Sequence, residues 1–568
     1  MDIGQDIEYF FIGFFVFMVA WYIHDKYVQR RHQLLINYPI IGRMRYFFEA
    51  VREPFRQYFA NEDFYESRDK IDWVYNASSN TPNYTSFSTG QPQPLPKFQI
   101  KHSNQVLNDD EIDDNFSVTI GDKRKSPFVT KSIIYRSAMS DGSISPEGTR
   151  AFVIGAKNGN FTINTGEGGL TSNFFVTHSN HGGDDYMENI AITGLNRTIY
   201  ILLSKLFNRA VALKVLRMML LTKETEDTYV IDFDSLIFFR PNWDLPLSHF
   251  PKKVPEDMPD IIYQVSSGLY GCRDKNGNFD EERYQKVASF CQATEIKIAQ
   301  GAKQTGGKLM AEKVTPAIAY YRGLEPYKDI FSPNRFPYAK TTKDLFDFVA
   351  KLQKLSKKPV GFKIVISSKD NIEEIAQEIK RRKEEKLEGI PDFITLDGGD
   401  GGSATAPLEL MDRVGLPVKD AIFIVNSILK EYGVRDQVKI LASSKILTPD
   451  DVAIALALGA DMVGIARGFM MSAGCIRARE CSGAHGRHCP VGLATQDPKK
   501  RAAYLVTKQA KGVESYHNNL LKGFKTVLAV VGKKSHKDLC KTDLQFIDKN
   551  GFVHNDVNRY YALKLNHK

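Results

Sequence analysis

The chain has few cysteines, little excess of either charge and only one long apolar run. Six cysteines in 568 residues are too few for a disulfide-stapled fold. The 76 Lys and Arg residues against 67 Asp and Glu leave a net charge of +9, which is too mild for a dedicated nucleic-acid binder. A composition of 42% hydrophobic and 25% charged residues excludes a disordered or collagen-like chain. We therefore expect a folded protein whose partner is an anionic ligand or an anionic membrane face.

The single long apolar run is YFFIGFFVFMVAWYI, residues 9–23. It is shorter than the about 20 residues that a full membrane span needs. Acidic residues precede it and basic residues follow it, so the positive-inside rule predicts that the rest of the chain is cytoplasmic. We predict that residues 1–31 form a single-pass anchor in the cell inner membrane. The alternative is a buried or dimer-forming N-terminal helix.

Three further regions follow the predicted anchor. Residues 32–129 form an expected N-terminal extension around the main domain, and residues 76–96 within it have the Ser, Thr, Asn and Pro content of a linker. Residues 130–510 are expected to form the catalytic domain. Residues 511–568 are expected to form a helical tail.

Within residues 130–510, short apolar segments alternate with amphipathic ones, which predicts parallel βαβ units. Either a doubly wound sheet or a (β/α)₈ TIM barrel fits this alternation. Polar and glycine-rich turns follow several different strands, and no G-x-G-x-x-G fingerprint opens a helix, so we favour the barrel. The clearest expected strands are 133–139, 361–367, 393–399, 438–444 and 461–468, and the clearest expected helices are 145–159, 371–386, 419–433 and 448–460.

Glycine-rich turns close to the expected rim suggest a phosphorylated cofactor. DGGDGG (397–402) and the strand ends at 443–445 and 466–468 lie where barrels often bind phosphate. Plain turn geometry is the alternative for any one of these turns. Lys363 lies inside an apolar strand, so we expect it to point into the barrel mouth and to stabilise negative charge on a reduced flavin.

A basic segment and an acidic loop are candidates for the substrate site. In EIKIAQGAK (295–303), Lys297, Gln300 and Lys303 are spaced to share one helical face, and they suit a dicarboxylate substrate. A solvated basic stripe is the alternative. Glu167 lies in the glycine loop 165–169 and is a candidate general acid or base, or else a structural carboxylate.

Cys475, Cys481 and Cys489 lie close together in a Gly- and Arg-rich stretch that ends in Cys-Pro. This spacing suits an iron–sulfur cluster. Zinc is an alternative, since His485 and His488 could complete a tetrahedral set, and reactive thiols without a metal are another. The remaining cysteines look isolated and are expected to be structural: Cys272, Cys291 and Cys540.

Taken together, these stretches resemble the FMN-dependent synthase domain of glutamate synthase, especially its short membrane-anchored form. The resemblance covers about residues 130 to 500 in the family order. It rests on SAMSDGSIS (137–145), INTGEGG (163–169), QVSSGLYG (264–271), EIKIAQGAK (295–303), GFKIV (361–365), DGGDGGSATAP (397–407) and CPVGLATQDP (489–498).

The resemblance implies FMN in the barrel beside a 3Fe-4S iron-sulfur cluster. It implies that 2-oxoglutarate and ammonia are converted to glutamate with a one-electron donor such as ferredoxin. Carried onto this chain, the catalytic candidates are Lys303, Glu167 and Lys297. The residues implied around FMN are Ala138, Met139, Ser140, Asn164, Gln264, Lys363, Gly399, Gly401, Gly402, Ser444, Gly464, Ala466 and Arg467. The implied substrate ligands are Lys297, Gln300, Lys303 and Arg322, and the implied cluster ligands are Cys475, Cys481 and Cys489.

The chain departs from the family pattern in several respects. Seven residues (482–488) separate the second and third cysteines, where the family has about four, and the loop 304–309 reads QTGGKL. No amidotransferase domain is recognised, so free ammonia or a separate glutaminase chain is the expected nitrogen source. Two other functions stay open at this point: a methylamine–glutamate N-methyltransferase-like enzyme and a non-catalytic flavoprotein scaffold.

Overall fold

The computed structural model describes most of the chain. The long described stretches are residues 3–29, 33–48, 67–83, 98–175, 187–208, 258–301, 303–407, 409–482, 488–501, 504–548 and 552–558, with short pieces at 51–55 and 211–256. The chain divides into two units, Met1–Arg68 and Asp69–Lys568. Each unit is described by itself below.

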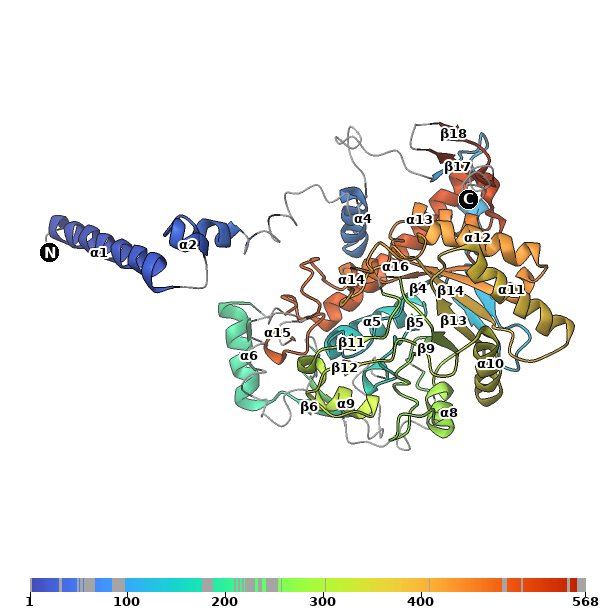
Figure 1. Ribbon diagram of the computed structural model, residues 1–568, viewed down its shortest axis with the longest axis horizontal. Coiled ribbons are helices and arrows are strands. Elements are labelled where there is room, and N and C mark those ends of the chain that lie inside the picture. The colour runs from blue at the N-terminus through green and yellow to red at the C-terminus, as the bar shows by residue number, and fades with distance from the viewer. Residues whose placement is uncertain are drawn as a thin grey trace. The chain divides into compact units, whose positions relative to one another are not determined.

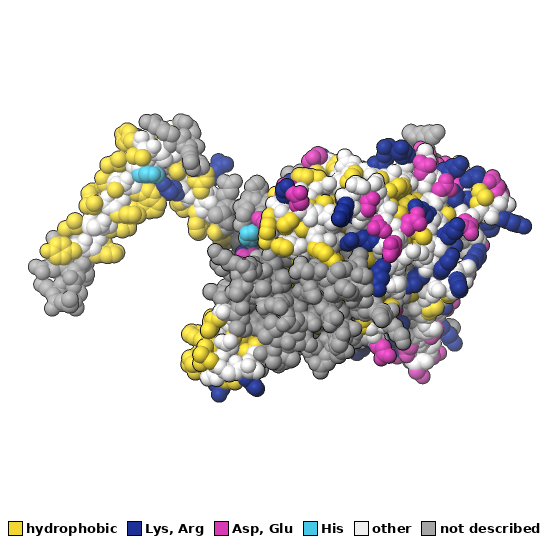
Figure 2. All heavy atoms as spheres, turned by 90° about the horizontal axis from the view of Figure 1, so that it is seen from below, with side chains coloured by type: hydrophobic (Ala, Val, Ile, Leu, Met, Phe, Trp, Pro, Cys, Tyr) yellow, Lys and Arg dark blue, Asp and Glu magenta, His cyan; other side chains and the backbone are white. Residues whose placement is uncertain are grey.

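The N-terminal unit is built around one apolar helix. Helix α1 (Ile3–Ile23) continues into a short π-helical turn, η1 (His24–Val28), and α2 (Gln33–Asn37) follows. The segment Tyr9–Val28 is long and apolar enough to cross a membrane, and only 6% of it is buried. Figure 2 shows apolar side chains along this helix. Buried helices and signal sequences can share this length and composition, so the anchor stays a prediction.

The second unit contains a closed barrel of eight parallel strands (Figure 1). Neighbouring strands pair in chain order, and the last strand pairs with the first, with Ile465 opposite Arg136. This closure confirms the predicted (β/α)₈ barrel and excludes the doubly wound sheet. The strands are β4 (Ile134–Arg136), β5 (Ile163–Asn164), β9 (Ile261–Val265), β10 (Ala293–Lys297), β13 (Val360–Ile364), β14 (Phe393–Asp397), β15 (Lys439–Ser443) and β16 (Met462–Ile465).

Helices with one apolar face cover the barrel, and several begin with the capping residues that the sequence offers. Ser145 accepts a hydrogen bond from the Gly148 amide, and Pro146 follows as the first helical residue. These helices are α5 (Pro146–Gly159), α8 (Glu281–Ser289), α9 (Pro316–Arg322), α10 (Thr342–Ser356), α11 (Lys369–Glu384), α12 (Val418–Glu431), α13 (Pro449–Leu458) and α14 (Arg467–Ser472). The expected strands and helices are therefore present, with the strands shorter than predicted.

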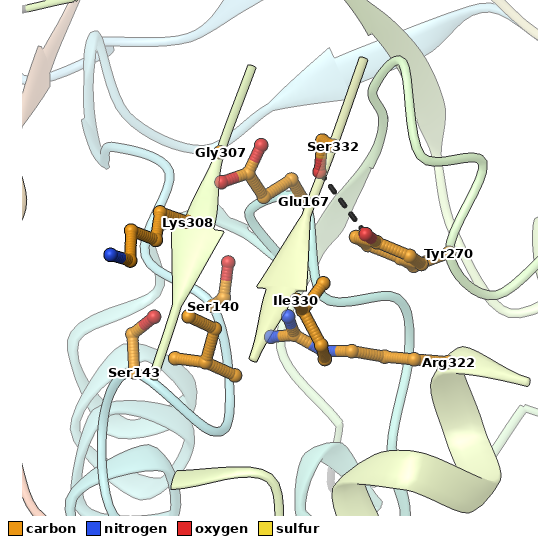
Figure 3. A pocket seen from close by; sticks show the side chains of 10 residues that line it. Ser140, Ser143, Glu167, Tyr270, Gly307, Lys308, Arg322, Ile330 and Ser332 are labelled. Carbon is orange, nitrogen blue, oxygen red and sulfur yellow. Dashed lines mark hydrogen bonds between the residues drawn. The ribbon is translucent and has the colours of Figure 1, made fainter. Parts of the chain in front are cut away.

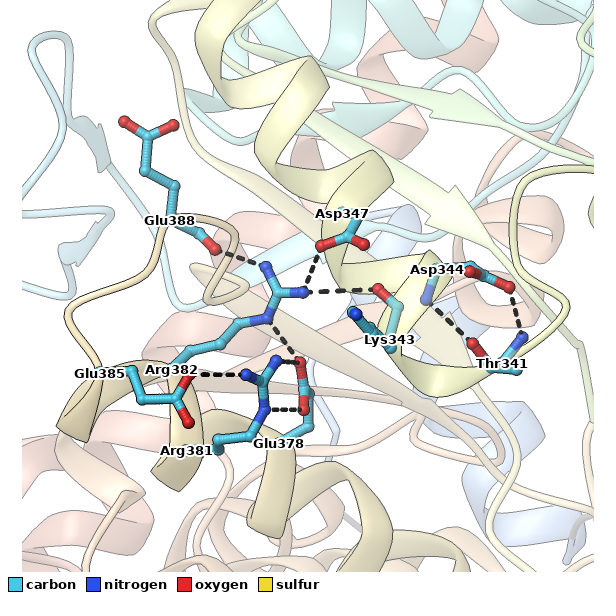
Figure 4. Close-up of polar contacts among 9 residues, drawn as sticks. All are labelled: Thr341, Lys343, Asp344, Asp347, Glu378, Arg381, Arg382, Glu385 and Glu388. Atoms are coloured by element: carbon cyan, nitrogen blue, oxygen red, sulfur yellow. Dashed lines mark hydrogen bonds and ion pairs between the residues drawn. The ribbon is translucent and has the colours of Figure 1, made fainter.

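Arg382 ties two of the outer helices together. This buried guanidinium of α11 donates to Glu378 Oε1 at 2.7 Å, to Asp347 of α10 at 2.5 Å and to the Glu388 carbonyl at 2.5 Å (Figure 4). A buried arginine needs such partners, because an unpaired buried charge is costly. The network stabilises the outside of the barrel, away from the rim described below.

Segments outside the repeating βα units complete the second unit. A three-stranded sheet of β6 (Met187–Ala191), β7 (Val230–Asp232) and β8 (Ile237–Pro241), together with α6 (Gly194–Leu206), lies in the chain between β5 and β9. The short hairpin β11 (Lys308–Leu309) and β12 (Ile330–Phe331) lies between β10 and β13. This hairpin contributes directly to the pocket described below.

The predicted extension and tail meet on one side of the barrel. Helix α4 (Arg68–Ser78) contacts α16 (Val506–Val531), where the Asn519 side chain donates to the Ala77 carbonyl at 2.8 Å. The tail is not wholly helical, because β17 (Leu544–Ile547) and β18 (Val553–His554) follow α16. Strand β17 pairs with β1 (Phe98–Ile100) on one side and with β18 on the other. Most of the predicted linker 76–96 lies outside the described residues, and its first residues belong to α4.

Candidate active site

Almost all of the predicted cofactor residues lie at the carboxyl ends of barrel strands, which meet at one rim in a parallel barrel. They come from four loops and four strands, so no single segment forms the site. Ala138, Met139 and Ser140 follow β4, Asn164 ends β5, Gln264 lies near the end of β9, Lys363 lies near the end of β13, Gly399, Gly401 and Gly402 follow β14, Ser444 follows β15, Gly464 lies in β16, and Ala466 and Arg467 follow β16.

Glu295 organises the interior just below this rim, and sequence reasoning did not single it out. Glu295 is 1% exposed. Its carboxylate accepts hydrogen bonds from Asn164 Nδ2 at 3.0 Å, Gln264 Nε2 at 2.6 Å and Thr395 Oγ1 at 2.5 Å. Both predicted amide ligands are therefore held in place by one carboxylate. Glu295 lies in β10, a strand that the sequence analysis did not predict, and buried glutamates are rare unless they are paired.

Three cations converge on Glu167 at the rim. Lys297 Nζ lies 2.9 Å from Glu167 Oε2, and Arg322 and Lys303 also attract this carboxylate. Burial opposes the ionisation of Glu167, but the three cations outweigh it and lower its pKa to about 2. Burial lowers the pKa of Lys303 and of Arg322, while Glu167 opposes both shifts. The candidate substrate residues therefore form one charge cluster, in which Glu167 is the counter-ion.

The prediction that Lys297, Gln300 and Lys303 share a helical face was wrong. Lys297 is the last residue of strand β10, and the other two lie in the loop that follows. The loop turns back on itself, so that the Lys303 amide donates to the Gln300 carbonyl at 3.2 Å. Lys303 Nζ then donates to Thr405 Oγ1 at 3.0 Å. Lys297 therefore reaches Glu167 from the end of its strand, and Lys303 approaches it from the turn, so helical spacing brings neither lysine there.

A small pocket opens beside this charge cluster (Figure 3). Its polar walls come from several loops, including the hairpin of the 304–309 segment that departs from the family pattern. The Tyr270 hydroxyl accepts a hydrogen bond from Ser332 Oγ at 3.1 Å, and the Arg322 guanidinium lies over the Tyr270 ring. The lining residues are Ser140, Ser143, Glu167, Tyr270, Gly307, Lys308, Leu309, Arg322, Ile330 and Ser332. Such a small cationic pocket suits a compact anion.

The residues expected around a cofactor phosphate lie close to one another. A Cβ atom on Gly402 would lie 2.8 Å from Arg467 Nη2, and one on Gly401 would lie 3.2 Å from Ser444 Oγ. These glycines therefore leave space beside an arginine and a hydroxyl, which fits a phosphate group. Two of the predicted cofactor residues have structural roles instead. The Gly399 amide donates to the Leu416 carbonyl, and the absence of a side chain at Gly464 leaves space for the Tyr135 ring.

Lys363 lies at the inner end of the same rim. Its side chain is 6% exposed, and its ammonium lies 3.7 Å from Asp397 Oδ2. Burial raises the pKa of Asp397, and Lys363 partly offsets this rise. A buried cation with a weakly held carboxylate partner fits a position beside an anionic flavin ring.

The three clustered cysteines also lie near one another. Burial, Cys481 and, more weakly, Cys489 raise the pKa of Cys475 to about 12. Burial and Cys489 likewise raise the pKa of Cys481, whereas Lys313 opposes that rise. The raised pKa values describe buried thiols that lie close enough to repel one another if they ionise.

The described residues show neither a zinc site nor an iron–sulfur site at these cysteines. His488 lies 3.9 Å from Glu312, and His485 lies outside the described residues. Among the described residues, no group of three or more His, Cys, Asp or Glu side chains is arranged to hold a single metal ion. Of the other cysteines, Cys272 and Cys291 are buried and Cys540 is exposed.

The chain is a (β/α)₈ barrel with a charged pocket at the carboxyl ends of its strands. Enzymes with this fold carry their active sites at that end of the barrel. A family model described as the conserved region in glutamate synthase matches residues 79–534. The chain therefore belongs to the glutamate synthase family, as its motifs predicted.

Individual relatives support the same membership. The chain is 30% identical over 594 residues to the glutamate synthase large subunit-like protein YerD of Bacillus subtilis, with 95% of this chain and 96% of that protein covered. It is 31% identical over 327 residues to the ferredoxin-dependent glutamate synthase of Cyanidium caldarium, with 55% of this chain and 19% of that enzyme covered. Among solved structures, the flavin-binding domain of baker's yeast flavocytochrome b2 superposes with a TM-score of 0.40 at 12% identity, covering 89% and 86% of the two chains.

Proposed function

We propose that the protein is an FMN- and iron–sulfur-dependent oxidoreductase that reductively aminates 2-oxoglutarate to glutamate with ammonia. The observation that carries this proposal is the convergence of Lys297, Lys303 and Arg322 on one carboxylate beside a rim pocket. Membership of the glutamate synthase family supports the reaction type. A non-catalytic scaffold would have no use for three buried cations around a pocket, so we do not favour it.

In this reaction three cationic side chains bind the dicarboxylate substrate, and Glu167 acts as the general acid or base. Lys297, Lys303 and Arg322 pair with the two substrate carboxylates, because charge-assisted hydrogen bonds are the strongest available to a dicarboxylate. When 2-oxoglutarate binds, Lys297 pairs with the substrate and no longer with Glu167. The pKa of Glu167 then rises toward its ordinary range. It can then give a proton to, or take one from, the nitrogen atom that becomes the amino group.

FMN supplies the hydride chemistry of the reaction when it is bound. Gly401, Gly402, Ser444 and Arg467 would hold its phosphate, and Lys363 would lie beside its ring. Asn164 and Gln264 would face the ring from positions that Glu295 sets.

A 3Fe-4S cluster held by Cys475, Cys481 and Cys489 would deliver electrons to the site. The trio of neighbouring thiols among basic residues supports this assignment. A one-electron donor such as ferredoxin would reduce it, in keeping with the ferredoxin-dependent relative. Ammonia would come from solution or from a separate glutaminase chain.

Anaerobically purified protein tests the function directly. FMN, iron and acid-labile sulfide are measured first, and the reduced flavin is then mixed with 2-oxoglutarate, with ammonium, or with both. We expect rapid reoxidation, with glutamate as the product, only when both are present. Reoxidation that requires neither compound, or no reoxidation in any mixture, would contradict the synthase proposal.

We also propose that residues 1–31 anchor the protein in the inner membrane by a single pass, with the barrel in the cytoplasm. The apolar, exposed segment Tyr9–Val28 supports this. Deleting residues 1–31 is expected to move the protein from the membrane fraction to the soluble fraction with its flavin retained. A full-length protein that is already soluble without detergent would refute the anchor and leave the proposed reaction untouched.

A further inference from the structure

Helix α6 carries an apolar face that the rest of the protein leaves exposed. Leu195, Leu202 and Leu206 are between 55% and 75% exposed. Their spacing of seven and four residues places them in one stripe along the helix. Ile201 and Phe207 are exposed as well, at 42% and 68%. Contiguous exposed apolar surface of this kind indicates an interaction site.

The charged side chains of the same helix are all basic. Arg197 and Lys205 are exposed, and α6 contains no acidic residue. Lys205 lies one helical turn beyond Ile201 and Leu202, so it borders the apolar stripe. The charge pattern extends beyond the helix in the sequence, because residues 189–223 contain six basic residues and no acidic ones: Arg197, Lys205, Arg209, Lys214, Arg217 and Lys223. An apolar stripe flanked by cations is complementary to an anionic surface above an apolar layer.

The seat of α6 in the fold leaves the stripe on its outer side. The helix belongs to the insertion between β5 and β9 and lies at the edge of the second unit (Figure 1). Tyr200, on the other side of the helix from Leu195 and Leu206, is 6% exposed. The helix is therefore held through Tyr200, and the exposed leucines are not needed to hold it.

The charges favour a lipid surface over a second copy of the chain as the occupant of this face. In a symmetric dimer the same patch of both copies meets at the interface. Arg197 and Lys205 of one copy would then face the same residues of the other, and like charges repel. The phosphate groups of anionic lipids attract both cations instead.

We propose that α6 binds to the surface of an anionic lipid bilayer, with Leu195, Leu202 and Leu206 among the acyl chains and Arg197 and Lys205 at the headgroup phosphates. An amphipathic helix of this composition lies in the plane of the membrane surface. Its contact is reversible and sensitive to salt, so α6 orients the barrel at the membrane and does not anchor it. This role depends neither on the proposed reaction nor on residues 1–31.

A fluorescent amino acid incorporated at Thr198 of the full-length protein tests the contact. Thr198 is an exposed residue of α6. The protein is reconstituted in vesicles of phosphatidylcholine alone or of phosphatidylcholine mixed with phosphatidylglycerol, and quenching by brominated acyl chains measures the contact with lipid. We expect strong quenching in the mixed vesicles, little quenching in phosphatidylcholine alone, and loss of the quenching at high salt.

Two pairs of substitutions separate the apolar from the charged contribution. Leu202→Gln combined with Leu206→Gln should abolish the quenching. Arg197→Gln combined with Lys205→Gln should lower the ratio of bound to unbound α6 about thirtyfold, which corresponds to about 1 kcal/mol for each cation at an anionic surface. Leu387→Gln is the matched control, because Leu387 is an exposed leucine beyond the end of α11, and it should leave the quenching unchanged.

Three results would overturn the proposal. The first is no quenching at Thr198 in either kind of vesicle. The second is equal quenching in both kinds that persists in the variant without Arg197 and Lys205. The third is an emission spectrum that shifts with protein concentration without quenching, which would show that a second copy covers this face. Glutamate formation does not enter the measurement, and a protein without a working anchor can be tested in the same way on added vesicles.

Discussion

Replacing Glu167 with glutamine is expected to lower the turnover number by about 10²- to 10⁴-fold, the usual contribution of a general acid or base. The same change should tighten the binding of 2-oxoglutarate, because Lys297 no longer has Glu167 Oε2 at 2.9 Å as a competing partner. A fall in turnover combined with a lower dissociation constant is an unusual pair of effects. Both effects follow from the role of Glu167 as the counter-ion of the cations that bind the substrate.

Single-turnover reoxidation of the reduced flavin and titration of the oxidised protein with 2-oxoglutarate measure the two effects separately. Glu325→Gln is the matched control, since Glu325 also pairs with a lysine, Lys328, but is 71% exposed outside the pocket. It should change neither quantity. If Glu167→Gln weakened diacid binding, Glu167 would be a substrate ligand and not a competitor.

The low pKa of Glu167 predicts that wild type and Glu167→Gln differ in how their stability depends on pH in acid. Its pKa is about 2 in the folded protein against an ordinary value of 4.5, so its ionised form stabilises the fold above about pH 4.5. This contribution is lost as the pH falls from about 4.5 to about 2, and glutamine cannot make it. Denaturant unfolding of wild type and Glu167→Gln should therefore give curves of free energy against pH that converge as the pH falls through this window.

Replacing Arg322 with methionine is expected to raise the dissociation constant of 2-oxoglutarate about a hundredfold, equivalent to about 2.7 kcal/mol. Arg322 is 3% exposed, lines the pocket and has one buried nitrogen, Nε, without a hydrogen-bond partner. Its position at the end of α9 is held by the carbonyl of Asp141 at 3.1 Å. The free donor of a positioned guanidinium is well suited to a carboxylate.

Arg283→Met controls for the loss of a partly buried arginine in the same region. Arg283 also donates to backbone carbonyls, including that of Tyr321, but it does not line the pocket. Titration by isothermal calorimetry should show weak binding in Arg322→Met and wild-type binding in Arg283→Met. Equal losses in both variants would point to a general effect on the fold around α9, and unchanged binding in Arg322→Met would remove Arg322 from the diacid site.

Local sequence patterns were sufficient for the architecture and for the identity of many rim residues. The strands β14, β15 and β16 lie within the apolar segments that predicted them, and β13 begins one residue before its segment, because burial on both faces requires a continuous apolar run. Ser145 and Pro146 marked the start of α5 because capping depends only on neighbouring residues. The resemblance then assigned the glycine turns, the basic residues and the clustered cysteines.

Only the closed barrel decided which of these residues meet. The bond between Lys297 and Glu167 joins residues 130 positions apart, and Lys313 reaches the carbonyl of Cys481 from 168 positions away. Glu295 holds Asn164 and Gln264 because three strands bring them to one interior layer, and residue spacing along the chain contains no such information. The helical face predicted for Lys297, Gln300 and Lys303 failed for the same reason. Periodicity reports on neighbours within a few residues, whereas the contacts of a rim loop depend on which strand ends the barrel closure brings together.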